Sequence, residues 1–252
     1  YASELDMAPV LNARAYHTAT LLNQRYLLVT GGTRMDRSIM TTVLLDTHTW
    51  PWLVLAAIVT GPQPTPRHGH SMVVDDARNR LVLFGGGSGS DLLRSGVDTE
   101  SVWALQMGPN WRKDLVRSFP WTWERLHDDR CSRSHENAVE GNSEQEARNH
   151  DPNILSPSEK LVLGRCHCAH KISRDSVVLL FGSGRPSTNG VLGYNLATDS
   201  FVRPRVQGPI PQARFTCCSV LLPTGHIFVH SGFGSAIGDA IPDMVVLDLC
   251  PS

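Results

Sequence analysis

The 252-residue chain has no long apolar run, no block of basic residues and almost no net charge, and each absence excludes a class of protein. No segment approaches the roughly 20 consecutive apolar residues that a membrane helix needs, so we expect no membrane span. The formal charge of −1 comes without a basic stripe, which argues against nucleic acid as a partner. The chain starts at Tyr1, and its first ten residues lack a signal-peptide pattern.

Cysteine is sparse for a chain that would depend on disulfides. The six cysteines include two close pairs, Cys166/Cys168 and Cys217/Cys218, whose members are too near in sequence to bridge easily. With 41% hydrophobic residues, a chain of this length can build a hydrophobic core without disulfide bonds. We therefore expect reduced thiols and a cytoplasmic or nuclear location.

Long helical periodicity is missing as well, and short apolar segments take its place. Four of these segments end in small residues: RYLLVTGG (25–32), RLVLFGGG (80–87), VVLLFGSG (177–184) and HIFVHSGFG (226–234). Upstream of each, an arginine opens another strand-like segment, at Arg14, Arg67, Arg165 and Arg214. The distance from this arginine to the first turn glycine is 17 or 18 residues in every case, which indicates an internal repeat.

Each repeat unit continues past its glycine turn. A third apolar segment follows in all four units (42–46, 101–105, 191–196 and 244–249), and an aromatic segment closes the first three (50–55, 121–126 and 200–204). Enrichment in β-branched and aromatic residues with flanking glycine and proline favours strands over helices. The sequence thus predicts one domain over residues 1–252, with four-stranded units at 9–55, 64–126, 161–204 and 209–249.

Two segments fall outside these units. Tyr1 precedes Arg14 by 13 residues, just as Phe201 precedes Arg214, so we interpret residues 1–5 as a strand that completes another unit. Residues 127–160 are polar, charged and poor in aromatics, which predicts a disordered insertion between the second and third units.

The repeat resembles the kelch family. The residues that carry the resemblance are Gly31–Gly32, Gly85–Gly86, the Arg-x-x-His openings Arg14…His17 and Arg67…His70, and Trp50, Trp52, Trp121 and Trp123 late in their units. Units three and four depart from it, because Ser183 and Phe233 stand in place of the second glycine. The resemblance implies an all-β fold, a kelch-type β-propeller of four four-stranded blades, either closed or part of a larger ring. The closing aromatic residues are expected to wedge between blades.

The resemblance also implies a function. Kelch propellers often bind partner proteins at the loops between their second and third strands, so we expect a non-catalytic protein-interaction module without a cofactor. The sequence pattern of the repeats is similar to that of the substrate-recognition propellers in plant-type F-box ubiquitin ligase adaptors. Two alternatives stay open: a kelch domain accessory to an enzyme, such as a methyltransferase fusion or a propeller oxidase, and a scaffold unrelated to ubiquitin.

Arginines just after the turn glycines are the candidate binding residues. They are Arg34, Arg37, Arg94 and Arg185. Because the guanidinium group binds carboxylate and phosphate bidentately, these arginines predict a basic rim for an acidic or phosphorylated protein segment. Acidic neighbours such as Asp36 and Asp91 would weaken that rim.

Three motifs that look chemical have structural interpretations. RHGHS (67–71) is the opening of a strand, and GGGSGS (85–90) lacks the Gly-Lys-Ser/Thr ending of a phosphate loop. In GRCHCAHK (164–171), strand alternation places Cys166, Cys168 and His170 on one face, where a structural zinc would still need a fourth ligand. By the arginine spacing, Cys168 stands where the first two units have histidine. We expect neither a metal site nor a catalytic residue.

Overall fold

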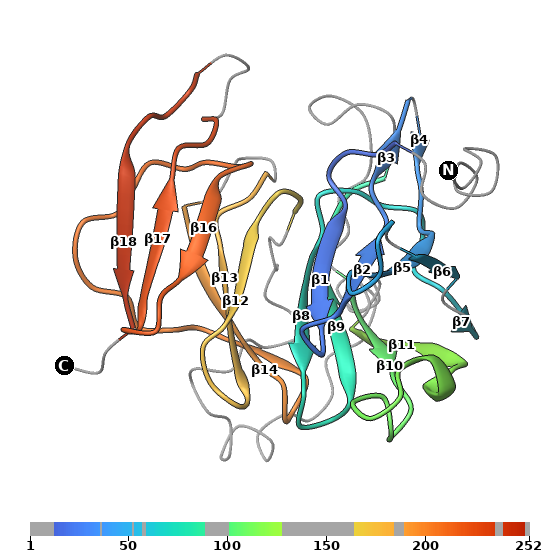
Figure 1. Cartoon of the computed structure of the whole chain (residues 1–252). Coiled ribbons are helices and arrows are strands. Elements are labelled where there is room, and N and C mark those ends of the chain that lie inside the picture. The colour runs from blue at the N-terminus through green and yellow to red at the C-terminus, as the bar shows by residue number, and fades with distance from the viewer. Residues whose placement is uncertain are drawn as a thin grey trace, which may run out of the picture.

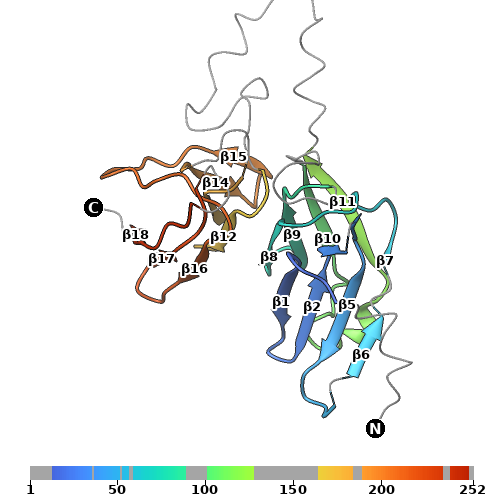
Figure 2. The same ribbon diagram turned by 90° about the horizontal axis from the view of Figure 1, so that it is seen from above.

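The computed structural model describes residues 13–35, 37–51, 53–56, 59–88, 101–127, 164–183, 189–234 and 239–249. Within these ranges the fold is all-β, as predicted, and its one helical element is the 3₁₀ turn η1 (Val116–Ser118). Four small sheets stand around a common axis as the blades of a β-propeller (Figures 1 and 2). The β-propeller prediction is confirmed.

Each blade is an antiparallel meander. Blade 1 contains β1 (Thr18–Leu22), β2 (Tyr26–Thr30), β5 (Thr42–Asp46) and β6 (Leu53–Ala56), with the small hairpin β3 (Thr33–Arg34) and β4 (Arg37–Ser38) between β2 and β5. Blade 2 contains β8 (Ser71–Asp75), β9 (Arg80–Phe84), β10 (Val102–Gln106) and β11 (Trp121–His127), and β7 (Val59–Thr60) adds to it parallel to β11. Blade 3 contains β12 (Cys168–Lys171), β13 (Ser176–Leu180), β14 (Val191–Asn195) and β15 (Ser200–Val202). Blade 4 contains β16 (Cys218–Leu221), β17 (His226–His230) and β18 (Met244–Asp248).

Two predicted segments lie outside the described residues. They are the strand expected at residues 1–5 and all of the expected insertion except its first residue, His127, which ends β11. Blade 4 has three strands in the part of the chain that the structure describes.

The first strands of the blades line the axis. Strands β1, β8, β12 and β16 contact one another in chain order, and the blades containing β1 and β16 lie at opposite ends of the arc (Figure 2). In blade 2, which has a neighbour on each side, every residue of β9 is buried. In blade 4, by contrast, Val220, Met244 and Val246 are exposed on one face. Packing between blades therefore buries the sheets.

The aromatic residues behave as wedges in two of the three predicted units. Trp121 and Trp123 are fully buried in a core that blade 2 shares with blade 1, and Phe201 lies in the core shared by blades 2 and 3. Trp50 is 90% exposed, so its predicted role as a wedge is wrong. It precedes β6 in a surface turn and does not reach a neighbouring blade. Trp52 lies outside the described residues.

The repeat register in blade 3 differs by one residue from the expected one. Three equivalent backbone bonds join neighbouring blades: Gly32 N to Arg67 O, Gly86 N to Gly164 O, and Gly182 N to Arg214 O. Gly164 therefore occupies the arginine position of blade 3, and Arg165 follows it by one residue. In this register His167 is the equivalent of His17 and His70, so the expected equivalence of Cys168 with these histidines is wrong.

The glycine common to all four units is the second of the doublet. Its positive φ is 105° at Gly32, 98° at Gly86, and 121° at Gly182 and Gly232. The first position has φ near 60° and accepts Phe181 or Ser231. The expected replacement of the second glycine by Ser183 and Phe233 is thus wrong. The physical reason is space as well as φ, because a Cβ on Gly32 would lie 2.7 Å from the carbonyl oxygen of Ala15.

The repeat arginines of blades 1, 2 and 4 hold the turns of those blades in place. In blade 2, the buried Arg67 donates from NH1 to Gly85 O (2.8 Å) and to Ser101 Oγ (3.1 Å). Arg14 donates to Gly31 O at 3.2 Å in the equivalent place. Arg214 donates to Ser231 O and also forms an ion pair with Asp243. Each guanidinium satisfies carbonyl groups that the turn after the second strand leaves without strand partners.

Candidate functional site

One end of the propeller gathers the connections between second and third strands. The first strand of each blade begins there and the second ends there, as the pairing of Thr18 with Thr30 shows for blade 1. We call this end the loop face. Its described residues are 13–17, 31–35, 37–41, 67–70, 85–88, 164–167, 181–183, 214–217, 231–234 and 239–243. The hairpin β3–β4 rises from it at the top of Figure 1.

Two of the four predicted binding arginines lie together on this hairpin. Arg34 and Arg37 are directly paired across β3 and β4, with Arg37 exposed and Arg34 partly buried. The hydroxyl of Thr33 donates to Arg37 O at 3.2 Å and braces the hairpin. Arg94 and Arg185 lie outside the described residues, as do the acidic neighbours Asp36 and Asp91.

A third cation lies near this pair. The pKa of the Arg14 guanidinium is lowered, first by burial and then by the charge of Arg34. A positive charge lowers the pKa of a neighbouring guanidinium only at short range, so Arg14 adds positive potential beside the hairpin. A bound carboxylate or phosphate would relieve that repulsion.

The loop face also exposes apolar groups that the sequence did not single out. Met35 at the tip of the hairpin is 90% exposed, and Tyr16 and Phe233 are exposed as well. Tyr16 lies 6.4 Å from the ring of His68, and Phe233 lies 6.1 Å from the ring of Phe215, measured between centroids. Arginine, methionine and aromatic residues are the types enriched at protein interfaces. The repeat register could have shown Tyr16, which follows a strand-opening arginine by two residues.

His68 fixes the hairpin to the body of the propeller. Its Nδ1 lies 2.9 Å from Ser38 Oγ on β4, and its Nε2 lies 3.5 Å from Arg165 NH1 in blade 3. Because a guanidinium only donates, Nε2 accepts, and the ring proton on Nδ1 is donated to Ser38. Burial and then the charge of Arg165 lower the pKa of His68, so the ring stays neutral and this arrangement persists.

Histidine–hydroxyl pairs join the first strands of neighbouring blades. The distance is 2.7 Å from Ser71 Oγ to His167 Nε2, 3.2 Å from Thr18 Oγ1 to His70 Nε2, and 2.7 Å from Ser219 Oγ to His170 Nε2. Burial lowers the pKa of His70 to about 3 and that of His167 to about 4.

Ser71 and His167 are as close as a catalytic nucleophile and its general base, but their environment is not that of a catalytic site. Both side chains are buried between blades, and His167 Nδ1 has no hydrogen-bond partner in the described structure. A catalytic histidine needs a group that orients it and a route to substrate. We therefore interpret these pairs as contacts that align neighbouring blades.

The stretch GRCHCAHK does not assemble a metal site among the residues that the structure describes. Cys168 Sγ faces Cys217 Sγ at 3.4 Å, His170 faces Ser219, and Cys166 sits in a left-handed turn with φ of 58°. In the described ranges, no group of three or more His, Cys, Asp or Glu side chains is placed to hold a metal ion.

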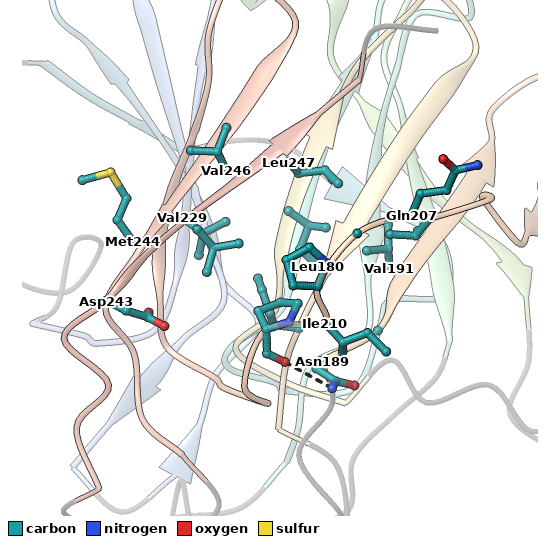
Figure 3. A pocket seen from close by; sticks show the side chains of 17 residues that line it. Leu180, Asn189, Val191, Gln207, Ile210, Val229, Asp243, Met244, Val246 and Leu247 are labelled. Atoms are coloured by element: carbon teal, nitrogen blue, oxygen red, sulfur yellow. Dashed lines mark hydrogen bonds between the residues drawn. The ribbon is translucent and has the colours of Figure 1, made fainter. Parts of the chain in front are cut away.

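A concave feature lies between blades 3 and 4. This cavity of about 660 Å³ is lined by the ends of β13 and β14, by β17 and β18, and by the linker 206–211 (Figure 3). Its walls are mostly apolar, including Leu180, Val191 and Leu247. Asn189 donates from Nδ2 to Pro211 O at 3.2 Å and holds the linker over the cavity.

The geometry defines a class of protein, a four-bladed β-propeller with an arginine-bearing, partly apolar loop face. No protein-family model matches the chain. In the described ranges, no helix is long and apolar enough to cross a membrane.

Proposed function

We propose that this chain is a non-catalytic protein-binding propeller whose loop face holds an acidic or phosphorylated segment of another protein. The observation that carries the proposal is the β3–β4 hairpin, which presents Arg34 and Arg37 beside Arg14. Guanidinium groups match the planar geometry of carboxylate and the oxygens of phosphate. The hairpin is rigidly placed, because His68 ties Ser38 to the body of the propeller.

Exposed apolar groups would supply the rest of the binding energy. Met35 stands between the two arginines, and Tyr16 lies on the same blade. Hot spots of protein interfaces are enriched in aromatic and arginine side chains that become desolvated on binding. A partner segment with an apolar residue next to its acidic group fits this surface.

In our proposal the propeller recruits substrates for a ubiquitin ligase of the F-box type, in the cytoplasm or nucleus. The motifs Arg14…His17 and Arg67…His70, together with the glycine doublets, support this reading through their resemblance to kelch repeats. The residue types exposed on the loop face support the binding of a protein substrate there.

Co-purification tests the ligase assignment. We expect the full-length gene product, tagged and expressed in its own cells, to recover the core subunits of a cullin-type ligase. Recovery of a stable partner set without any ligase subunit would contradict the adaptor role and favour a scaffold. A catalytic domain in the full-length gene product itself would favour the role as an accessory domain of an enzyme.

Charge reversal tests the loop face. We expect Arg34→Glu/Arg37→Glu to reduce recovery of the substrate partner at least tenfold while ligase subunits remain bound. The matched control is Arg112→Glu/Arg117→Glu, because these arginines lie in the connection from β10 to β11 at the opposite end of the propeller. Equal recovery with both double variants would refute the site.

A further inference from the structure

Cys168 and Cys217 bring two thiols together across the seam between blades 3 and 4. Cys168 begins β12 and Cys217 directly precedes β16, and these two strands lie side by side at the propeller axis. The Sγ atoms are 3.4 Å apart, although 49 residues separate the two positions in sequence. Both side chains are partly exposed, so a small oxidant has access to them.

From this geometry we propose that Cys168 and Cys217 are a redox modification site, at which a small-molecule disulfide such as oxidised glutathione converts the two thiols into a disulfide between blades 3 and 4. A disulfide has a sulfur–sulfur bond of about 2.05 Å. The thiols must therefore approach by roughly 1.4 Å to form this bond.

The two cysteines have different roles in the exchange. The protonated Cys168 thiol lies within reach of the Cys217 carbonyl oxygen, at 3.5 Å. Once Cys168 is ionised, the Cys217 thiol donates to the Cys168 thiolate, and this hydrogen bond lowers the pKa of Cys168 and raises that of Cys217. Ser219 also stabilises the Cys168 thiolate. Cys168 is thus the attacking sulfur and Cys217 the resolving one.

The thiol–disulfide exchange takes place in two steps. The Cys168 thiolate attacks one sulfur of the oxidant, forms a mixed disulfide and releases one small-molecule thiolate. Cys217 then loses its proton to water, and its thiolate attacks the Cys168 sulfur and releases the second small-molecule thiolate. Two protein thiols lose two electrons in total, and one small-molecule disulfide becomes two thiols.

The position of the pair gives the modification a structural effect. In the described chain, β16 packs on β12, and the apolar core behind them joins Leu180 of blade 3 to Ile227 and Val229 of blade 4. A covalent link at the axis would fix this seam, which also borders the cavity between the two blades. In a reducing compartment the link stays open until the thiol–disulfide balance shifts.

Peptide mapping of the wild-type chain tests the proposal. The folded protein is incubated with millimolar oxidised glutathione, free thiols are alkylated, and digests are analysed by mass spectrometry without reduction. We expect a cross-linked peptide joining Cys168 to Cys217 and a melting temperature about 5–10 °C above that of the reduced protein, because the link closes a 49-residue loop. Reduction with dithiothreitol should reverse both changes.

Variants sharpen the assignment because Cys166 and Cys218 adjoin the pair in sequence. The variant Cys166→Ser/Cys218→Ser/Cys250→Ser should keep the cross-link and the melting shift. Cys168→Ser and Cys217→Ala should lose both, with circular dichroism confirming that each variant is folded. Separate glutathione adducts on the two wild-type cysteines, unmodified thiols, or a cross-link to any other cysteine would overturn the proposal.

Discussion

At Ser231 and Gly232, two neighbouring residues of the blade 4 turn have positive φ, but only one of them requires glycine. Ser231 has φ of 59°, which lies in the left-handed region that other residues enter at modest cost. Gly232 has φ of 121°, and an added Cβ would lie 3.1 Å from Phe215 O and 3.2 Å from the Cβ of Cys217. The difference in φ between the two positions recurs at each blade. In blade 1 the first position is also crowded, because a Cβ on Gly31 would lie 2.5 Å from Cε1 of His70 in the next blade.

We expect Gly232→Ala to lower the free energy of unfolding by about 2 kcal/mol or more, because it combines a strained φ with a backbone contact. The adjacent control, Ser231→Gly, should change it by less than about 1 kcal/mol. Urea denaturation of both variants measures the difference. Equal losses would mean that the turn does not depend on the second position.

Residue identity alone misled the register in one blade. Arg165 has the spacing of a repeat arginine, yet Gly164 makes the backbone bond that defines the position. A spacing count tolerates an error of one residue, whereas a β-ladder does not, because a one-residue slip moves side chains to the opposite face. The equivalence of His167 with His70 therefore emerged only from the hydrogen bonds.

At the scale of elements, the sequence located the strands but not what joins the blades. The apolar segments predicted strands at the places where β2, β9, β13 and β17 lie. A buried ion-pair network joins blades 2 and 3, where Arg80 of blade 2 pairs with Asp199 of blade 3. The sequence could not show this network, because 119 residues separate Arg80 from Asp199. Such partners depend on how two sheets pack. The hairpin that pairs Arg34 with Arg37 was likewise unpredicted, although both arginines were chosen.

Arg80 provides a test of that network. Its buried guanidinium pairs with Asp75 at 2.9 Å and with Asp199 at 2.7 Å. We expect Arg80→Met to reduce the free energy of unfolding by roughly 2–3 kcal/mol, because both carboxylates lose a charged hydrogen-bond donor. The loss is limited because Asp75 keeps its ion pair with Arg78 and the Asp199 side chain is 30% exposed.

Arg112 is the matched control, since its ion pair with Asp76 is about half exposed at both ends. Arg112→Met should cost less than about 1 kcal/mol. Chemical denaturation compares the two variants. A loss at Arg80 no larger than that at Arg112 would contradict a stabilising role for the buried network.

The buried histidines of the first strands predict a dependence on pH. The pKa is about 3 for His70 and about 4 for His167 in the folded chain, below the usual value of 6.5. At a pH between the folded and the unfolded pKa of each histidine, the unfolded chain binds more protons than the folded one. The free energy of unfolding therefore falls as the pH drops below about 6.5. Each histidine contributes a slope of roughly 1.4 kcal/mol per pH unit.

Unfolding measured between pH 7 and 5 isolates the histidines, because most carboxylates titrate at lower pH. The double variant His70→Gln/His167→Gln keeps a donor toward Thr18 and Ser71, and its stability should vary less over this range. An unchanged slope in the variant would show that other groups cause the acid sensitivity.

At the scale of the whole molecule, the two ends of the propeller differ in kind. The loop face displays Met35, Tyr16 and the hairpin arginines. At the opposite end, η1 and the residues around it form a connection in which Arg117 is 89% exposed and pairs with Asp114. Arg112 in the same connection pairs with Asp76, so two of the three cations of this connection have carboxylate partners. We therefore propose that the partner binds at the loop face and not at this opposite end.

A footprint of the bound partner tests this central claim most directly. Hydrogen–deuterium exchange is measured on the propeller alone and in complex with the substrate partner recovered from cells. We predict slower exchange on binding at residues 31–41 and 13–17, with residues 107–120 unchanged. Protection confined to residues 107–120, or to the outer strands β6, β11 and β15, would contradict the account.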